Sequence, residues 1–167
     1  MEITAQHTFA RPLDQVWAMF LDPEAHVGKY ADMGQRDVEI VEMQQRADAL
    51  DITIVRIIDG EVPAIAKKFI KPSNAMTTKD QWERDTDGTC TGRSVISVRN
   101  VPIASSAVAT LVADGADACT YTIDLTVHLK IPVVGDRILR ALRPQLLGQM
   151  EAEFDASERW LARTSAP

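Results

Sequence analysis

The segment that decides the fold of this chain is residues 134–163, which read VGDRILRALRPQLLGQMEAEFDASERWLAR. Its apolar residues recur at helical spacing, so it predicts one amphipathic helix of roughly 45 Å. Pro144 lacks the N–H that a helix interior needs, and Arg143 is a poor N-cap, so we expect a bend there instead of a break. The apolar arc of this helix consists of Leu139, Leu142, Leu146, Met150, Ser157 and Trp160.

The chain before this helix follows mainly the two-residue period of β-strands. Residues 2–9 alternate apolar and polar side chains and form the first expected strand. Two short helices follow, one beginning at Pro12 and the other beginning at Asp22–Pro23 and ending before Gly34. Residues 36–130 predict an antiparallel meander, because the connections are too short for parallel crossovers. Its expected strands are 36–46, 50–58, 64–70, 75–84, 91–99, 104–114 and 118–130.

Composition indicates one soluble globular domain spanning residues 1–167. The chain is 46% hydrophobic and 25% charged, which is typical of a packed domain. Its net charge of −6 argues against nucleic acid as a partner, because phosphates select basic surfaces. No apolar run is long enough to cross a bilayer, so we expect no integral membrane association.

The start of the sequence and its cysteine content predict the cellular compartment in which the protein works. Residues 1–3 open directly into a strand pattern instead of a signal peptide. Cys90 and Cys119 are the only cysteines, too few for a disulfide scaffold or a structural zinc site. Together these features predict a cytoplasmic protein with reduced thiols.

Three short stretches connect the chain to a known superfamily. They are PLDQVW at 12–17, DPEAHVGKYADMG at 22–34 and IPVVG at 131–135. With the order of the elements, they make the chain similar to the START-like, or SRPBCC, superfamily, which includes birch-pollen-allergen-like proteins and polyketide cyclases. The Asp-Pro-Glu and Lys-Tyr groups within 22–34 resemble one uncharacterised bacterial branch, a domain-of-unknown-function family. The resemblance covers nearly the whole chain.

This resemblance implies an α+β helix-grip fold. Its topology is a strand, two short helices, a six-stranded meander and a long C-terminal helix, around which the curved antiparallel sheet wraps. It also implies a hydrophobic cavity between sheet and helix. It implies no particular chemistry, because the superfamily includes carriers, cyclases, hydrolases and activators.

The sequence shows no catalytic or cofactor-binding motif. A phosphate-binding glycine loop, an HExxH pair, a nucleophile elbow and a CxxC pair are all absent from it. His7, His26 and His128 are far apart and have no companions at metal-ligand spacing, so we expect structural or surface roles for them. We therefore expect no metal and no cofactor, and the sequence assigns no oligomeric state.

Three ionisable residues fall on faces that the periodicity turns inward. Glu153 lies within the apolar arc of the last helix, Asp80 shares a strand face with Trp82, and Arg56 shares one with Ile54. Because a lone buried charge is costly, such groups are paired, protonated or face a wet cavity. We hypothesise that Arg56, Asp80 and Glu153 line the cavity and orient a polar group of the ligand. The alternatives are structural ion pairs, or a β-bulge that turns Asp80 and Arg56 to solvent.

The remaining ligand-binding candidates are aromatic or aliphatic. Tyr121 begins a strand face that continues through Ile123 and is expected to face the long helix, and Trp17 is a further wall candidate. The alternative for such side chains is an ordinary core role, although in this fold core and cavity wall are partly the same surface. The predicted ligand-binding set is Arg56, Trp82, Tyr121, Ile123, Leu142, Leu146, Met150 and Glu153.

Three functions fit these observations. The leading hypothesis is a carrier or sensor that binds a lipid-like or aromatic small molecule, because no nucleophile or base is recognisable. The second is a cyclase or hydrolase in which Asp80 or Glu153 acts as general acid or base, and a cavity carboxylate with a raised pKa and no cationic partner would favour it. The third is a protein that binds a partner peptide in its groove, which an exposed apolar patch at the groove mouth would favour.

Overall fold

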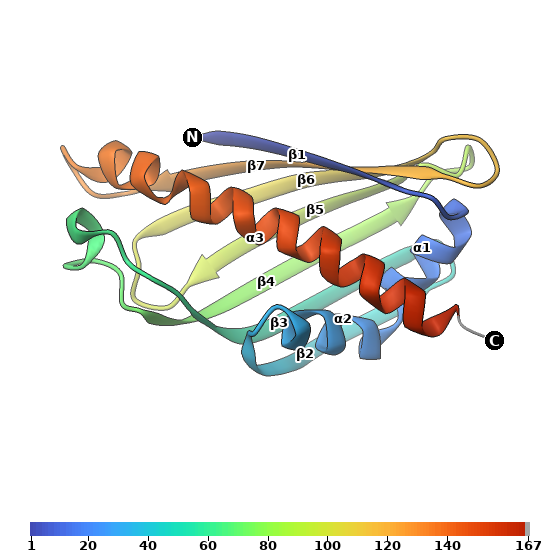
Figure 1. The fold of residues 1–167 in the computed structure, drawn as a ribbon, viewed down its shortest axis with the longest axis horizontal. Coiled ribbons are helices and arrows are strands. Elements are labelled where there is room, and N and C mark those ends of the chain that lie inside the picture. Colours follow the sequence, from blue (N-terminus) through green and yellow to red (C-terminus); the bar gives the residue numbers. More distant parts are fainter. Residues whose placement is uncertain (166–167) are drawn as a thin grey trace.

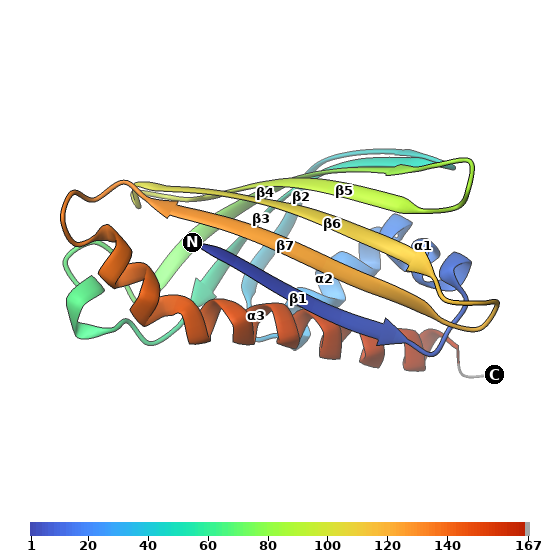
Figure 2. The same ribbon diagram turned by 90° about the horizontal axis from the view of Figure 1, so that it is seen from above.

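Seven antiparallel strands form a single sheet in the computed structural model, which describes residues 1–165. The sheet order is β1-β7-β6-β5-β4-β3-β2, so β1 pairs with the last strand and β2 to β7 form a meander. Figure 2 shows α3 lying along one face of this sheet. The elements are β1 (Glu2–Phe9), α1 (Leu13–Leu21), α2 (Pro23–Asp32), β2 (Arg36–Arg46), β3 (Ala49–Asp59), η1 (Ala64–Ala66), β4 (Ser73–Arg84), β5 (Cys90–Val98), β6 (Ile103–Ala113), β7 (Cys119–Leu129) and α3 (Gly135–Thr164).

This is the α+β helix-grip arrangement that the sequence predicts, with one strand, two short helices, a six-stranded meander and one long helix. The predicted strand at 64–70 is wrong. Pro63, with φ of −53°, starts a helical turn there, and the N–H of Ala66 donates to its carbonyl at 2.8 Å. Ile70 donates to Ala66 in turn, so local bonds satisfy this backbone without a partner strand. Ala66, Ile65 and Ile70 of this segment still pack against the core.

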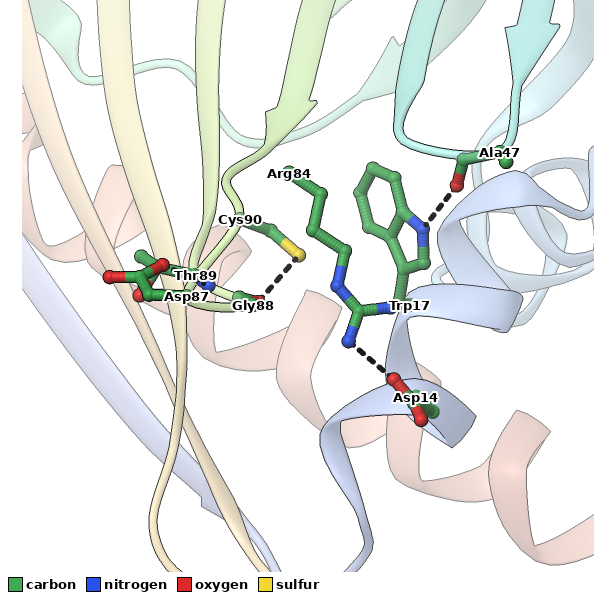
Figure 3. A network of polar contacts seen from close by, with 8 residues as sticks. All are labelled: Asp14, Trp17, Ala47, Arg84, Asp87, Gly88, Thr89 and Cys90. Carbon is green, nitrogen blue, oxygen red and sulfur yellow. Dashed lines mark hydrogen bonds and ion pairs between the residues drawn. The ribbon is translucent and has the colours of Figure 1, made fainter.

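Helix α2 begins where the sequence predicts, and α1 begins one residue later than predicted, with Pro12 as its N-cap. The side chain of Asp22 caps α2 by accepting a hydrogen bond from the N–H of Glu24 at 2.9 Å, and Pro23 is the first helical residue. Two contacts hold α1 against one end of the sheet (Figure 3). Arg84 of β4 pairs with Asp14, and the indole N–H of Trp17 donates to the carbonyl of Ala47 at 3.1 Å.

The C-terminal helix α3 is continuous over thirty residues, and Pro144 lies inside it. Figure 2 shows the helix changing direction in its first third, the part that contains Pro144. The side-chain amide of Gln145 donates to the carbonyl of Glu61 at 2.7 Å. This bond ties α3 to the segment that carries η1, which Figure 1 shows in green beside the first turns of α3.

The core lies between the sheet and the helices. Leu139, Phe154 and Leu161 of α3 are buried in it. Cys90 and Cys119 are both buried and both free. Among the helices of residues 1–165, none has both the length and the apolar composition that a membrane span requires.

Candidate ligand-binding cavity

A cavity of about 190 Å³ lies between the concave face of the sheet and the helices α2 and α3. On β5 and β6 the cavity is lined by four small side chains, Ser94, Ser105, Ala107 and Ala109, which we call the floor, and beside them by Ile96, Val98 and Ile103. The strand register places Ser94 opposite Ala107, and Ala109 opposite Gly92. Short side chains on neighbouring strands leave open the volume that larger residues fill elsewhere in the core, since protein interiors are otherwise close-packed.

One wall of the cavity is aromatic. The ring centroids of Phe20 and Trp82 are 4.8 Å apart, and Tyr121 lies 5.5 Å from Phe20 and 6.1 Å from Trp82. All three line the cavity and are almost fully buried, so they are core and cavity wall at once. Trp17 packs on Trp82 from behind, with ring centroids 6.3 Å apart, and is not among the lining residues.

Trp82 lies flat over Gly92 of the neighbouring strand. A Cβ at position 92 would come within 2.5 Å of the indole atom Cε2. Gly92→Ala should therefore force the indole toward the cavity and lower the free energy of unfolding by about 1–3 kcal/mol, as overpacking does. Chemical denaturation of both proteins measures this change. Gly60→Ala is the matched control, because nothing lies within 4 Å of its Cβ position. Equal stabilities of the two variants would contradict the close packing.

The roof of the cavity comes from α3 and is shorter than the sequence predicts. Leu146, Met150 and Glu153 line the cavity, but Leu142 does not. Leu142 lies one turn nearer the start of the helix, beyond Pro144, where it packs as a partly buried residue against the core. The structure thus brings together every predicted site residue except Leu142, and their roles in binding stay predictions.

Arg56 is 7% exposed and extends along the cavity wall. Its Nε donates to Oε1 of Gln35 at 2.7 Å, and its Nη1 donates to Oγ1 of Thr78 at 2.7 Å. The guanidinium also stacks 4.0 Å above the ring centroid of Tyr30. Within residues 1–165 no carboxylate lies within 4.0 Å of it. Arg56 is therefore held inside the protein by neutral partners.

The end of α2 places the partner of Arg56. Gly34 has φ of +78°, which favours glycine, and its N–H donates to the carbonyl of Ala31 while that of Gln35 donates to Tyr30. This pair of bonds is a Schellman motif, which ends the helix and turns the chain toward β2. It leaves Gln35 between Arg56 and Gln149, whose Oε1 accepts from Gln35 Nε2 at 3.2 Å.

Asp80 lines the cavity in the middle of β4. The register between β3 and β4 runs without interruption, so the alternative of a bulge does not apply. Part of the Asp80 side chain faces the cavity, but its Oδ1 atom is buried and has no hydrogen-bond partner within residues 1–165. The pKa of Asp80 is raised from 3.8 to about 6, mainly by burial and also by the charge of Glu153, while a hydrogen bond from Ser94 and the charges of Arg56 and Lys29 oppose the shift.

Two buried basic residues of α2, His26 and Lys29, lie near the cavity, although the sequence predicts no site role for them. Lys29 is 1% exposed, and its Nζ lies 5.3 Å from the ring centroid of Phe20. Burial lowers the pKa of Lys29, and the charges of Glu153 and Asp80 oppose this shift. Helical spacing could have shown that both residues are buried. The buried face of α2 consists of Ala25, His26, Lys29 and Tyr30, which recur at that spacing.

His26 lines the cavity and is held in its neutral form. Its Nε2 lies 2.7 Å from the carbonyl of Phe20 and donates to it when the ring is neutral. Burial first, and then the charge of Lys29, lowers the pKa of His26 to about 4. In the described part of the chain, no three histidine, cysteine or acidic side chains come together as a metal would require.

A sequence-family model covers residues 4–161 and carries the description "Protein of unknown function (DUF2505)". The chain belongs to this family. No protein with a curated description matches the DUF2505 protein in sequence. Solved structures match it over nearly the whole chain, so the fold that the superfamily resemblance implies is confirmed.

Three solved structures illustrate the shared fold. Zhui aromatase/cyclase from Streptomyces sp. R1128 is 17% identical to the DUF2505 protein, with a TM-score of 0.60 and coverage of 100% of this chain and 99% of that one. A START superfamily protein from Mycobacterium smegmatis is 14% identical, with a TM-score of 0.59 and coverage of 98% and 99%. Norcoclaurine synthase from Thalictrum flavum, in complex with dopamine and hydroxybenzaldehyde, is 16% identical, with a TM-score of 0.59 and coverage of 100% and 89%. At these identities the likeness extends to the fold alone.

Proposed function

We propose that this protein binds a small, mainly apolar molecule in the cavity between its sheet and α3. The observation that carries the proposal is an interior space of about 190 Å³ above a floor of serine and alanine side chains. Apolar cavities of about 150 Å³ hold a benzene molecule, whereas sites for drug-sized ligands span about 300–1,000 Å³. The volume therefore favours a ligand of one or two rings, or an aliphatic molecule of similar size, over a long lipid.

The interior of the site supports the same proposal. Aliphatic and aromatic side chains make most of the wall, and polar groups gather near Arg56, Asp80 and Glu153. A ligand with an apolar body and one polar group matches this division. The two free, buried thiols support the further proposal that the protein works in the cytoplasm.

Filling the floor of the cavity tests the function directly. Ala107→Leu adds three carbon atoms at a buried cavity position and should abolish ligand binding while the fold persists. Native mass spectrometry of the protein purified from its own host should show a co-purifying molecule, or added one- and two-ring compounds should raise the Tm, in the wild type and in the control but not in Ala107→Leu. Ala104→Leu on the same strand is the matched control, because Ala104 is exposed. A wild type that neither carries a molecule nor gains thermal stability contradicts the proposal.

A second candidate function is general acid or base catalysis by Asp80. The observation that favours it is a cavity carboxyl group whose pKa is raised to about 6 and which has no cationic partner within 4.0 Å in residues 1–165. Incubating the molecule identified by mass spectrometry with the protein tests it. Conversion that stops in Asp80→Asn, with binding retained, supports catalysis, and an unchanged molecule in the wild type excludes it.

A further inference from the structure

One buried oxygen atom at the polar end of the cavity has no hydrogen-bond partner in residues 1–165. Arg56 is engaged by Gln35 and Thr78, and His26 by the carbonyl of Phe20. Within residues 1–165, Oδ1 of Asp80 is the buried side-chain oxygen or nitrogen atom left without a partner. A buried carboxylate oxygen without a donor is costly, so the carboxyl group of Asp80 gains most from a ligand that donates a hydrogen bond. Rotation about its Cβ–Cγ bond is soft and brings either oxygen to the cavity side.

The charges around Asp80 indicate that the donor is neutral. Counted at their formal charges, the two acidic side chains Asp80 and Glu153 balance the two basic side chains Lys29 and Arg56. His26 is neutral at pH 7 because burial lowers its pKa to about 4, and burial raises the pKa of Tyr30 and Tyr121, which keeps both phenols neutral. The formal sum is zero, so an ammonium or carboxylate on the ligand would bring an uncompensated charge into the interior. A hydroxyl group brings none.

The strand register sets where the rest of such a ligand lies. Asp80 stands opposite Ser94, and Ser94 stands opposite Ala107, so the three share one row across β4, β5 and β6. Neighbouring strands are about 4.8 Å apart, so this row is about 10 Å wide, which is close to the length of a two-ring molecule. A hydroxyl at Asp80 therefore places the rings over the small side chains of the floor, beneath Leu146 and Met150.

From these contacts we infer that the cavity selects a neutral one- or two-ring alcohol or phenol whose hydroxyl group donates a hydrogen bond to the carboxylate of Asp80. This inference rests on the proposed function and names the chemical class of its ligand. A hydrogen bond from a neutral hydroxyl to a carboxylate is shorter and stronger than one between neutral groups.

Four naphthalenes with different substituents test the inference by equilibrium dialysis at pH 8. They are 2-naphthol, the size-matched 2-methylnaphthalene, the cation 2-(aminomethyl)naphthalene and the anion 2-naphthoate. We expect wild-type protein to bind 2-naphthol at least about tenfold more tightly than each of the others, the effect of one hydrogen bond to a charged group. In Asp80→Leu the preference for 2-naphthol over 2-methylnaphthalene should vanish.

The controls separate this inference from the function on which it rests. Asp124→Leu removes a carboxylate from the exposed face of β7 and should keep the full preference. If Asp80→Leu does not fold, Asp80→Asn replaces it and should lose most of the preference, because a neutral acceptor is weaker. Equal wild-type affinities for 2-naphthol and 2-methylnaphthalene, or tighter binding of either charged compound, overturn the inference and leave the proposed function standing. If the wild type binds none of the four, the inference fails, and native mass spectrometry with the Tm measurements decides the proposed function separately.

Discussion

Replacing Arg56 by alanine should lower the free energy of unfolding by about 3 kcal/mol or more. The substitution removes two hydrogen bonds of 2.7 Å from a charged donor and leaves Gln35 and Thr78 without that partner. It also removes the stacking on Tyr30 and leaves Asp80 and Glu153 with Lys29 as the remaining nearby cation. In a chain of this size the Tm should fall by about 6–12 °C, and chemical denaturation measures the free energy itself.

Arg93→Ala is the control for that experiment. Arg93 is exposed on β5, so its loss should change the free energy of unfolding by less than about 0.5 kcal/mol. Arg56→Lys should recover only part of the loss, because an ammonium group cannot make the same forked contacts with Gln35 and Thr78. A variant Arg56→Ala as stable as Arg93→Ala would show that the buried guanidinium contributes nothing to folding.

Asp80→Asn should raise the stability of the unliganded protein at pH 8 by up to about 3 kcal/mol. The pKa of Asp80 is raised from 3.8 to about 6 on folding, and each pKa unit corresponds to about 1.4 kcal/mol. Because the folded state binds this proton more tightly, the carboxyl group favours folding most below pH 3.8. Its contribution is lost as the pH rises from 3.8 to 6, and above that range the ionised group stays destabilising. Asparagine carries no such charge at any pH.

Denaturation curves at pH 4, 6 and 8 test the sign of this effect. The difference in free energy between Asp80→Asn and wild type should be near zero at pH 4 and largest at pH 8. Asp124→Asn removes a charge from the exposed surface and should show no comparable trend. A gain that is the same at all three pH values would mean that it comes from the shape of the amide and not from the lost charge.

Most of the fold followed from patterns that act locally. The caps Asp22–Pro23 and Gly34 mark α2, and the helical spacing after residue 134 marks α3, because each depends on bonds within a few residues. The wrong prediction of a strand at 64–70 also came from a local pattern. A short apolar run such as residues 64–66 fits a strand or a helical turn equally well, and the segment has no two-residue period that would favour a strand.

The sequence predicts a site residue when the periodicity of its own strand or helix decides which way the side chain points. It does not predict a site residue whose position depends on the pairing or packing of neighbouring elements. The two-residue period turns Asp80 and Trp82 toward the same side, and the structure places both in the cavity wall. Lys29 was missed because a lysine on a short helix usually points to water. The small floor was missed because Ser94 and Ala107 become neighbours only through strand pairing, which the sequence of either strand does not contain.

The pairing of β1 with β7 has a consequence for how the protein folds during synthesis. Glu2 stands opposite Thr126, so the first strand to leave the ribosome must wait for the last one. At about 5–20 residues per second this interval lasts about 6–25 seconds, and throughout it the apolar side chains of Ile3 and Phe9 have no sheet to join. Strands β2 to β7 pair with neighbours in sequence and can form progressively. Within this sheet β1 is therefore made first and paired last, and until then its apolar side chains are open to non-native contacts.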